Sequence, residues 1–436
     1  MLVDRRDRRP ILLANARIMD PSRDLDMVGD LLLADGIIRE AKRGIGAAGV
    51  PEGTEVVDCR GRIAAPGLID MRAFVGEPGA ESRETIASAS QAAAAGGVTT
   101  IVCQPDTEPA IDDPTIVDFI QRRARDTGIV NIFVMAALTK GLKGGEMTEI
   151  GLLKAAGAVG FTDGARSVTD AQVMRRALTY ARDFDALIVH HTEDPDLTGE
   201  GVMNEGEFAA RLGLIGAPKA AETVMLERDM RLVGLTEGRY HAASVTCKDS
   251  LEVLKRAKDA GLAVTASASI NHLALNENDI GGYRTFFKVS PPLRDEEDRR
   301  ALVDALEQGL IDVVISDHNP QDVEVKRLPF AEAAPGAVGI ETMLPAVLRL
   351  VHSGDLKLMT ALKALSSRPA ELLGLPGGTL RPGAPADVVV IDPDDPWILD
   401  RDDLKSKCRN TPFDEARMQG RAVRTIVGGR TVYEYV

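Results

Sequence analysis

The sequence predicts an α/β fold: a (β/α)8 barrel of TIM type, with a small β-sandwich domain built from both chain ends. Eight short runs of apolar and β-branched residues occur in the middle of the chain, and helical stretches lie between most of them. The two ends instead alternate short apolar runs with turns, which is typical of hairpins. The eight predicted barrel strands are residues 67–72, 98–103, 130–138, 158–163, 186–191, 239–245, 262–267 and 312–317.

The stretches between these strands have helical signals. Residues 83–97 combine an alanine-rich body with a glycine stop. Residues 169–184 start at Thr169, the expected N-cap, and carry apolar residues at three- and four-residue spacing. Similar patterns recur at residues 220–238, 249–261 and 296–309. The strands themselves are apolar without interruption, which suits a parallel sheet that is buried on both faces.

The chain ends predict two halves of one β domain. We place the halves at residues 1–62 and 377–436 and the barrel at residues 63–376. Near the C-terminus, "VGGR" at residues 427–430 separates two β-branched runs, as in a hairpin with a two-glycine turn.

Composition excludes several classes of protein. The chain has 436 residues, 44% of them hydrophobic, and a formal net charge of −14. Such an acidic chain is not expected to bind nucleic acid or an anionic membrane, since both are polyanions. No run approaches the roughly 20 apolar residues that span a bilayer. The four cysteines form no C-x-x-C pair and are widely scattered, so we expect reduced core thiols in a cytoplasmic protein.

Chemistry in a barrel of this kind lies at the C-terminal ends of the strands. The residues at those ends include both polar and apolar side chains. They are Arg72, Phe74, Cys103, Asp163, His190, His191, Ser244, Asp317 and His318. Cys103 has no histidine assigned to it, and we interpret it as a structural residue.

Several motifs, taken in order, resemble the amidohydrolase superfamily and, within it, the dihydroorotases of the long bacterial type. The resemblance extends from about Ile11 to Tyr435. The motifs are "APGLIDM", "ETIASASQAAAAGGVTTIVCQPDTEP", "GVMNEGEFAARLG", "FFKVSPPLRDEEDR", "ISDHNP", "SKCRNTPF" and "VGGRTVY". Active members hold two zinc ions through a His-x-His pair, a bridging carboxylate, two further histidines and a final aspartate. The metals activate a bridging water, and the aspartate transfers the proton.

The resemblance implies that half of this metal site has been lost. The His-x-His pair falls on Arg72 and Phe74, and the sixth-strand histidine falls on Ser244. The retained positions are Asp163 for the bridge, His191 for the fifth strand, and Asp317 for the proton-transferring base. Each metal would keep two protein ligands, fewer than the three of a usual catalytic zinc. We therefore expect no metal; if one is bound, Asp163, His191 and Asp317 would hold it.

Four positions that contact the substrate in the family are also altered. The arginine that binds the substrate carboxylate falls on Gly76, and an asparagine becomes Asp106. A second asparagine becomes Ser290, and a histidine after the eighth strand becomes Gln321. The first two changes alter the charge that an anionic substrate would meet.

Arg72 suggests how the remaining carboxylates are neutralised. Burying Asp163 and Asp317 at one end of the barrel without a cation would be costly. A guanidinium has five donors and a fixed positive charge. We expect Arg72 to pair with Asp317, Asp163 or both in place of zinc.

Three hypotheses for function follow. The first is a catalytically inactive dihydroorotase-like subunit of pyrimidine biosynthesis, assembled with the aspartate transcarbamoylase catalytic chain and itself a homo-oligomer. The second is an active dihydroorotase, interconverting N-carbamoyl-L-aspartate and dihydroorotate with a reduced metal site. The third is another cyclic-amide hydrolase that uses a single metal.

Overall fold

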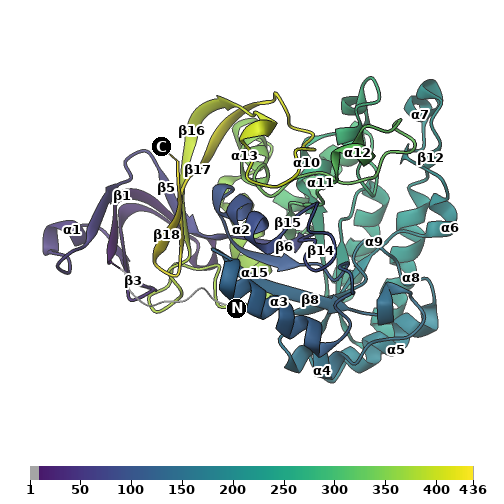
Figure 1. The fold of residues 1–436 in the computed structure, drawn as a ribbon, viewed down its shortest axis with the longest axis horizontal. Coiled ribbons are helices and arrows are strands. Elements are labelled where there is room, and N and C mark those ends of the chain that lie inside the picture. Colours follow the sequence, from purple (N-terminus) through teal and green to yellow (C-terminus); the bar gives the residue numbers. More distant parts are fainter. Residues whose placement is uncertain (1–8, 436) are drawn as a thin grey trace.

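The computed structural model describes residues 9–435 and contains the predicted barrel (Figure 1). Eight parallel strands lie in the order β15-β14-β13-β10-β9-β8-β7-β6, which is the order of a barrel sheet. Each overlaps one of the eight predicted runs. They are β6 (Leu68–Ala73), β7 (Val98–Cys103), β8 (Asn131–Ala137), β9 (Gly160–Thr162), β10 (Leu187–His191), β13 (Arg239–Ala243), β14 (Val264–Ser269) and β15 (Val313–Ile315).

The barrel closes between its first and last strands. Ala73 pairs with His318 in a parallel bridge, and the backbone N–H of Phe74 donates to the carbonyl of His318 over 2.8 Å. Residues that are about 245 positions apart in sequence thus become neighbours. This closure places the end of β6 beside the residues that follow β15.

Apolar side chains fill the inside of the barrel away from this end. The packed cluster contains Met71, Val102, Met135, Leu187, Val189, Ala243, Val313 and Ile315, with Leu372 and Leu373 of α15. The polar groups of the strand ends therefore lie at the opposite, C-terminal mouth of the barrel.

Helices surround the barrel as the sequence predicted, with one correction at a cap. They include α2 (Ile86–Ala95), α3 (Pro114–Thr127), α4 (Ile150–Ala155), α5 (Ala171–Arg182), α8 (Ala220–Thr236), α9 (Lys248–Asp259), α11 (Glu296–Glu307), α13 (Met343–His352), α14 (Leu358–Leu362) and α15 (Arg368–Leu373). The predicted N-cap of α5, Thr169, is wrong. The cap is Asp170, whose carboxylate accepts from the N–H groups of Gln172 and Val173 and so satisfies two otherwise free donors.

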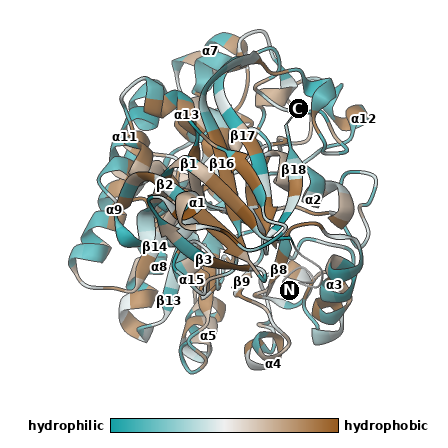
Figure 2. Ribbon diagram, turned by 90° about the vertical axis from the view of Figure 1, so that its left-hand side faces the viewer, coloured by the Kyte–Doolittle hydropathy of each residue, from teal (hydrophilic) through white to brown (hydrophobic). Residues whose placement is uncertain are grey.

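Strands from both chain ends form one continuous sheet, in the order β18-β17-β16-β5-β1-β2-β3, with β4 paired to β1. Its apolar strands appear brown in Figure 2, whereas the helices around the barrel alternate brown and teal. The predicted two-glycine turn joins β17 to β18. The strands are β1 (Ile11–Asp20), β2 (Leu25–Ala34), β3 (Ile37–Lys42), β4 (Glu55–Asp58), β5 (Ile63–Pro66), β16 (Val388–Ile398), β17 (Arg417–Val427) and β18 (Arg430–Glu434).

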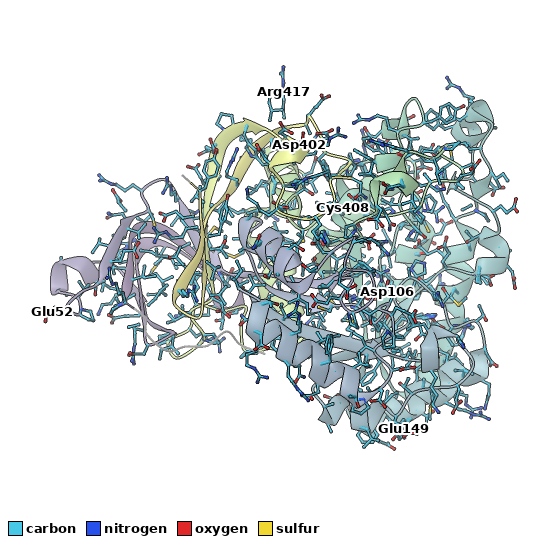
Figure 3. All side chains as sticks on the ribbon, in the orientation of Figure 1. Glu52, Asp106, Glu149, Asp402, Cys408 and Arg417 are labelled. Atoms are coloured by element: carbon cyan, nitrogen blue, oxygen red, sulfur yellow. The ribbon has the colours of Figure 1, made fainter. Side chains whose placement is uncertain are left out.

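The segment between β16 and β17 crosses from this sheet to the barrel mouth, and Figure 3 labels Asp402 and Cys408 on it. Glu341 accepts hydrogen bonds from the N–H groups of Lys405 and Ser406. Asn410 donates to the carbonyl of Gly336 over 3.0 Å. The segment is therefore anchored to the loops around the C-terminal mouth.

All four cysteines are buried free thiols, as predicted. Burial raises the pKa of Cys103 to about 12, which disfavours the reactive thiolate. Among residues 9–435, no helix has the length and apolar character needed to cross a bilayer.

Candidate functional site

Arg72 and Asp317 form an ion pair at the mouth of the barrel. The Nε of Arg72 donates to Oδ1 of Asp317 over 3.0 Å, and the two side chains are 10% and 12% exposed. Nη1 of Arg72 also lies 3.5 Å from the carbonyl oxygen of Gly164. The predicted pairing of Arg72 with a retained carboxylate is thus present, and the partner is Asp317.

Asp163 lies outside this ion pair, so of the pairings expected for Arg72 only the one with Asp317 is present. Its carboxylate accepts from the N–H of Thr139 over 2.8 Å and from the hydroxyl of the same residue. Burial raises the pKa of Asp163, although both bonds from Thr139 oppose that rise. No sequence pattern points to Thr139, because its contact with Asp163 depends on where the loop after β8 meets the end of β9.

His191, the third retained position, has a different partner again. Its Nε2 lies 3.0 Å from Oε2 of Glu193, and its Nδ1 is buried without a hydrogen-bond partner among the described residues. Burial opposes ionisation of Glu193, but the hydrogen bond and charge of His191 keep the pKa of that carboxyl below its usual range. The imidazole is thus held by a neighbouring carboxylate two residues along the chain.

His190 is a structural residue of the barrel wall. Its Nδ1 lies 2.6 Å from Oδ2 of the buried Asp229, and its Nε2 accepts from the N–H of Val168 over 2.8 Å. The hydroxyl of Tyr240 donates to the same oxygen of Asp229 over 2.6 Å. Burial penalises the charged form of Asp229, but His190, Arg228 and Tyr240 together hold its pKa below the ordinary 3.8.

Tyr240→Phe is expected to lower the free energy of unfolding by about 1.5 kcal/mol at neutral pH, because it removes a hydrogen bond to a buried charge. The pKa of Asp229 is lower in the folded chain than in the unfolded chain, where it is near 3.8, so its ionisation stabilises the fold at pH values above 3.8. This contribution is lost as the pH falls through the pKa of the folded state. The difference between variant and wild type should therefore narrow below pH 3.8 in urea titrations. Tyr180→Phe is the control; equal losses in both variants would contradict the role given to Asp229.

Phe74, which the resemblance places at a ligand position, is covered by a second guanidinium. The Cζ of Arg83 lies 3.9 Å from the centre of the Phe74 ring. Arg83 also donates to Oδ1 of Asn319 over 2.7 Å and to the carbonyl of Pro320 over 2.8 Å. Arg83 was missed by the sequence analysis, since no motif links it to the strand ends.

Ser244 has an unusual backbone conformation at the barrel mouth. It has φ of 54°, and Asp317 has φ of 51°, a left-handed conformation that is unfavourable for residues other than glycine. The Ser244 hydroxyl is buried and has no partner among the described residues. The barrel mouth therefore contains two non-glycine residues in the left-handed conformation, Ser244 and Asp317.

The four residues that the resemblance places at substrate positions occupy different environments. Gly76 is buried with φ of +46°, and an added Cβ would lie 2.5 Å from the carbonyl oxygen of Ala80. Asp106, labelled in Figure 3, is half-buried; desolvation raises its pKa, while the charges of Arg72, Arg83 and Arg166 oppose that rise. Ser290 lines a separate cavity of about 580 Å³. Gln321 donates from its side chain to Oδ1 of Asn319 over 3.1 Å.

These residues do not fit the zinc pair of the family. In the part of the chain that the structure describes, no three His, Cys, Asp or Glu side chains are grouped as metal ligands. Asp163, His191 and Asp317 bond to Thr139, Glu193 and Arg72 respectively. The set named from the sequence as the alternative metal site is therefore not assembled.

Comparisons with known proteins give consistent matches. The dihydro-orotase-like family model matches residues 61–250, and the amidohydrolase family model matches residues 338–433. A dihydroorotase of Pelobacter propionicus is 42% identical over 97% of this chain and 99% of its own length. A dihydroorotase of Geobacter metallireducens is 41% identical over the same shares. The solved L-hydantoinase (dihydropyrimidinase) of Arthrobacter aurescens superposes with a TM-score of 0.88 at 26% identity, covering 97% of this chain and 96% of that one.

The parallel barrel and the sheet built from both termini are the amidohydrolase fold, in agreement with the family match. The matches extend over nearly the whole chain at more than 40% identity. This chain belongs to the dihydroorotase family.

Proposed function

We propose that this chain is a catalytically inactive dihydroorotase-like protein of pyrimidine biosynthesis, which acts as an assembly subunit. The observation that carries the proposal is the ion pair between Arg72 and Asp317. It places a guanidinium on the carboxylate that would have to bind metal and move a proton.

The chemistry of the family supports this reading. Hydrolysis of a cyclic amide requires a water of lowered pKa and polarisation of the ring carbonyl, both of which metals supply. Here three ligand positions carry Arg72, Phe74 and Ser244. A base is useful only when it is free to accept a proton, whereas Asp317 is bonded to a permanent cation.

Protein purified without chelator is expected to contain far less than one zinc per chain and to show no turnover of dihydroorotate or N-carbamoyl-L-aspartate. The triple variant R72H/F74H/S244H is expected to bind about one zinc, because two histidines and Asp317 supply the three ligands of a catalytic zinc. Elemental analysis and a turnover assay measure both results. R72Q/F74L/S244A is the control, since it removes the same side chains without adding ligands.

Near-stoichiometric zinc in the wild type would overturn the proposal. Zinc together with dihydroorotate turnover would identify the protein as an active dihydroorotase with a reduced metal site. The similarity to the L-hydantoinase of Arthrobacter aurescens favours a different alternative. Zinc with turnover of hydantoins or dihydropyrimidines, but not of dihydroorotate, would identify another cyclic-amide hydrolase.

The partner we propose is the aspartate transcarbamoylase catalytic chain, with this protein as a homo-oligomer in the assembly. A barrel that is complete but lacks its metal ligands is useful through its surface, and the partner would then carry the chemistry. Sizing chromatography of the two co-expressed chains should give one peak larger than either alone. The same peak should form with Arg72→Met if assembly needs no catalysis; separate elution of the wild-type chains would contradict the proposal.

A further inference from the structure

A cavity of about 330 Å³ lies where the segment between β16 and β17 packs against α12 (Val323–Lys326). Gln321 and Asn410 join its two walls, since the N–H of Gln321 donates to Oδ1 of Asn410 over 3.1 Å. One carboxylate, Asp402, lines the cavity. Its cationic residues are Lys326, Arg327, Arg401 and Arg409.

Two of the four cations are held in place by carbonyl groups. The buried ammonium of Lys326 donates to the carbonyls of Ala334 and Thr285 over 2.8 and 3.0 Å. Burial, with the charge of Lys288, lowers the pKa of Lys326 to about 7, whereas the carbonyl oxygens favour its protonated form. Arg409 donates to the carbonyls of Leu404 and Ser406. Carbonyls fix these groups without neutralising their charge.

The other two guanidiniums keep free donors. Arg327 is exposed, and within residues 9–435 its side chain has neither a hydrogen bond nor an ion pair. Arg401 lies 5.6 Å from the ring centre of Phe286 and has a distant carboxylate contact, 3.6 Å to Asp414. Guanidinium groups suit planar, two-point contacts with phosphate oxygens.

The charge of this cavity contrasts with that of the chain. The protein has a formal net charge of −14, yet four cations and one carboxylate line this cavity. Like charges held together raise each other's energy, and an anion between them would relieve that repulsion. The cavity is therefore built for a negatively charged occupant.

We propose that this cavity binds a small, multiply charged anion that carries a phosphate group. Arg327 and Arg401 would donate to the phosphate oxygens, while Arg409 supplies fixed positive charge beneath them and Lys326 adds a charge when it is protonated. Phe286 offers a ring for any organic part of the ligand. The bound anion would join the loop after β15 to the segment between β16 and β17, and so raise the thermal stability of the protein.

Calorimetric titration of the full chain with phosphate, pyrophosphate and a nucleoside monophosphate, at constant ionic strength, tests this proposal. At least one should bind saturably with Kd of about 1 mM or tighter, and Arg327→Gln should weaken that binding about tenfold. Arg125→Gln, an equal charge change at an exposed position of α3, is the control and should bind as the wild type does. The melting temperature without ligand should be the same in all three proteins.

Each outcome decides a point. Absence of saturable binding by all three ligands overturns the proposal, and so does equal weakening in Arg327→Gln and Arg125→Gln. Binding of pyrophosphate that Phe286→Ala leaves unchanged assigns the site to the phosphate groups alone. Tighter nucleotide binding that is lost in Phe286→Ala assigns it to a nucleotide. The zinc and turnover assays do not depend on this cavity, so either proposal can fail without the other.

Discussion

Arg72→Met is expected to lower the free energy of unfolding by about 3 kcal/mol, because it leaves the carboxylate of Asp317 nearly buried without its cation. Methionine keeps much of the volume of the aliphatic part of arginine. The loss of stability therefore measures mainly the removal of the charge and only to a small extent a loss of packing. Urea unfolding at neutral pH, with chelator present to keep metal from replacing the guanidinium, measures the difference.

The double variant R72M/D317N should recover most of this loss, since removing both charges of a buried pair is often nearly neutral. Arg122→Ala is a matched control, because the ion pair of Arg122 with Asp118 is 65% and 50% exposed. Exposed pairs contribute about 0–1 kcal/mol. If Arg72→Met costs no more than Arg122→Ala, the ion pair has no stabilising role at the barrel mouth.

Gly76→Ala is expected to destabilise the protein by about 3 kcal/mol, because two costs combine at this position. The backbone has φ of +46°, which a side chain disfavours. The added Cβ would also lie 2.5 and 2.7 Å from the carbonyl oxygens of Ala80 and Glu84, which belong to the backbone and cannot rotate away. Thermal and urea unfolding measure the change.

Gly44→Ala separates the two costs. Gly44 has φ of +75° with no atom within 4 Å of an added Cβ, so that variant should lose only about 1 kcal/mol. Equal losses at Gly44 and Gly76 would show that the loop after β6 adjusts freely. If the prediction holds, no side chain can be introduced at position 76 without rearranging the loop of residues 76–84.

Local patterns were sufficient for the fold. Each barrel strand is an apolar run bounded by turn residues, and all eight predicted runs overlap a strand of the structure. Helix boundaries were less certain: Thr169 and Asp170 are both good caps, and only the backbone bonds show that Asp170 is used. Arg72 and Phe74 could be singled out as candidate site residues because they lie two residues apart in one motif at the end of the first predicted strand.

Contacts between distant segments could not be predicted in the same way. Thr139 binds Asp163 from the loop of another strand, and Arg83 reaches Phe74 from the loop before α2. Neither contact leaves a pattern in sequence, since each depends on where two loops meet above the barrel.

The sequence by itself determined the barrel and the β domain from both ends, because these depend on local periodicity and short motifs. Only the tertiary structure decided that Arg72 pairs with Asp317 while Asp163 bonds to Thr139. The physical reason is barrel closure. The bridge between Ala73 and His318 brings the end of β6 beside Asp317, whereas the loop after β8 places Thr139 against Asp163.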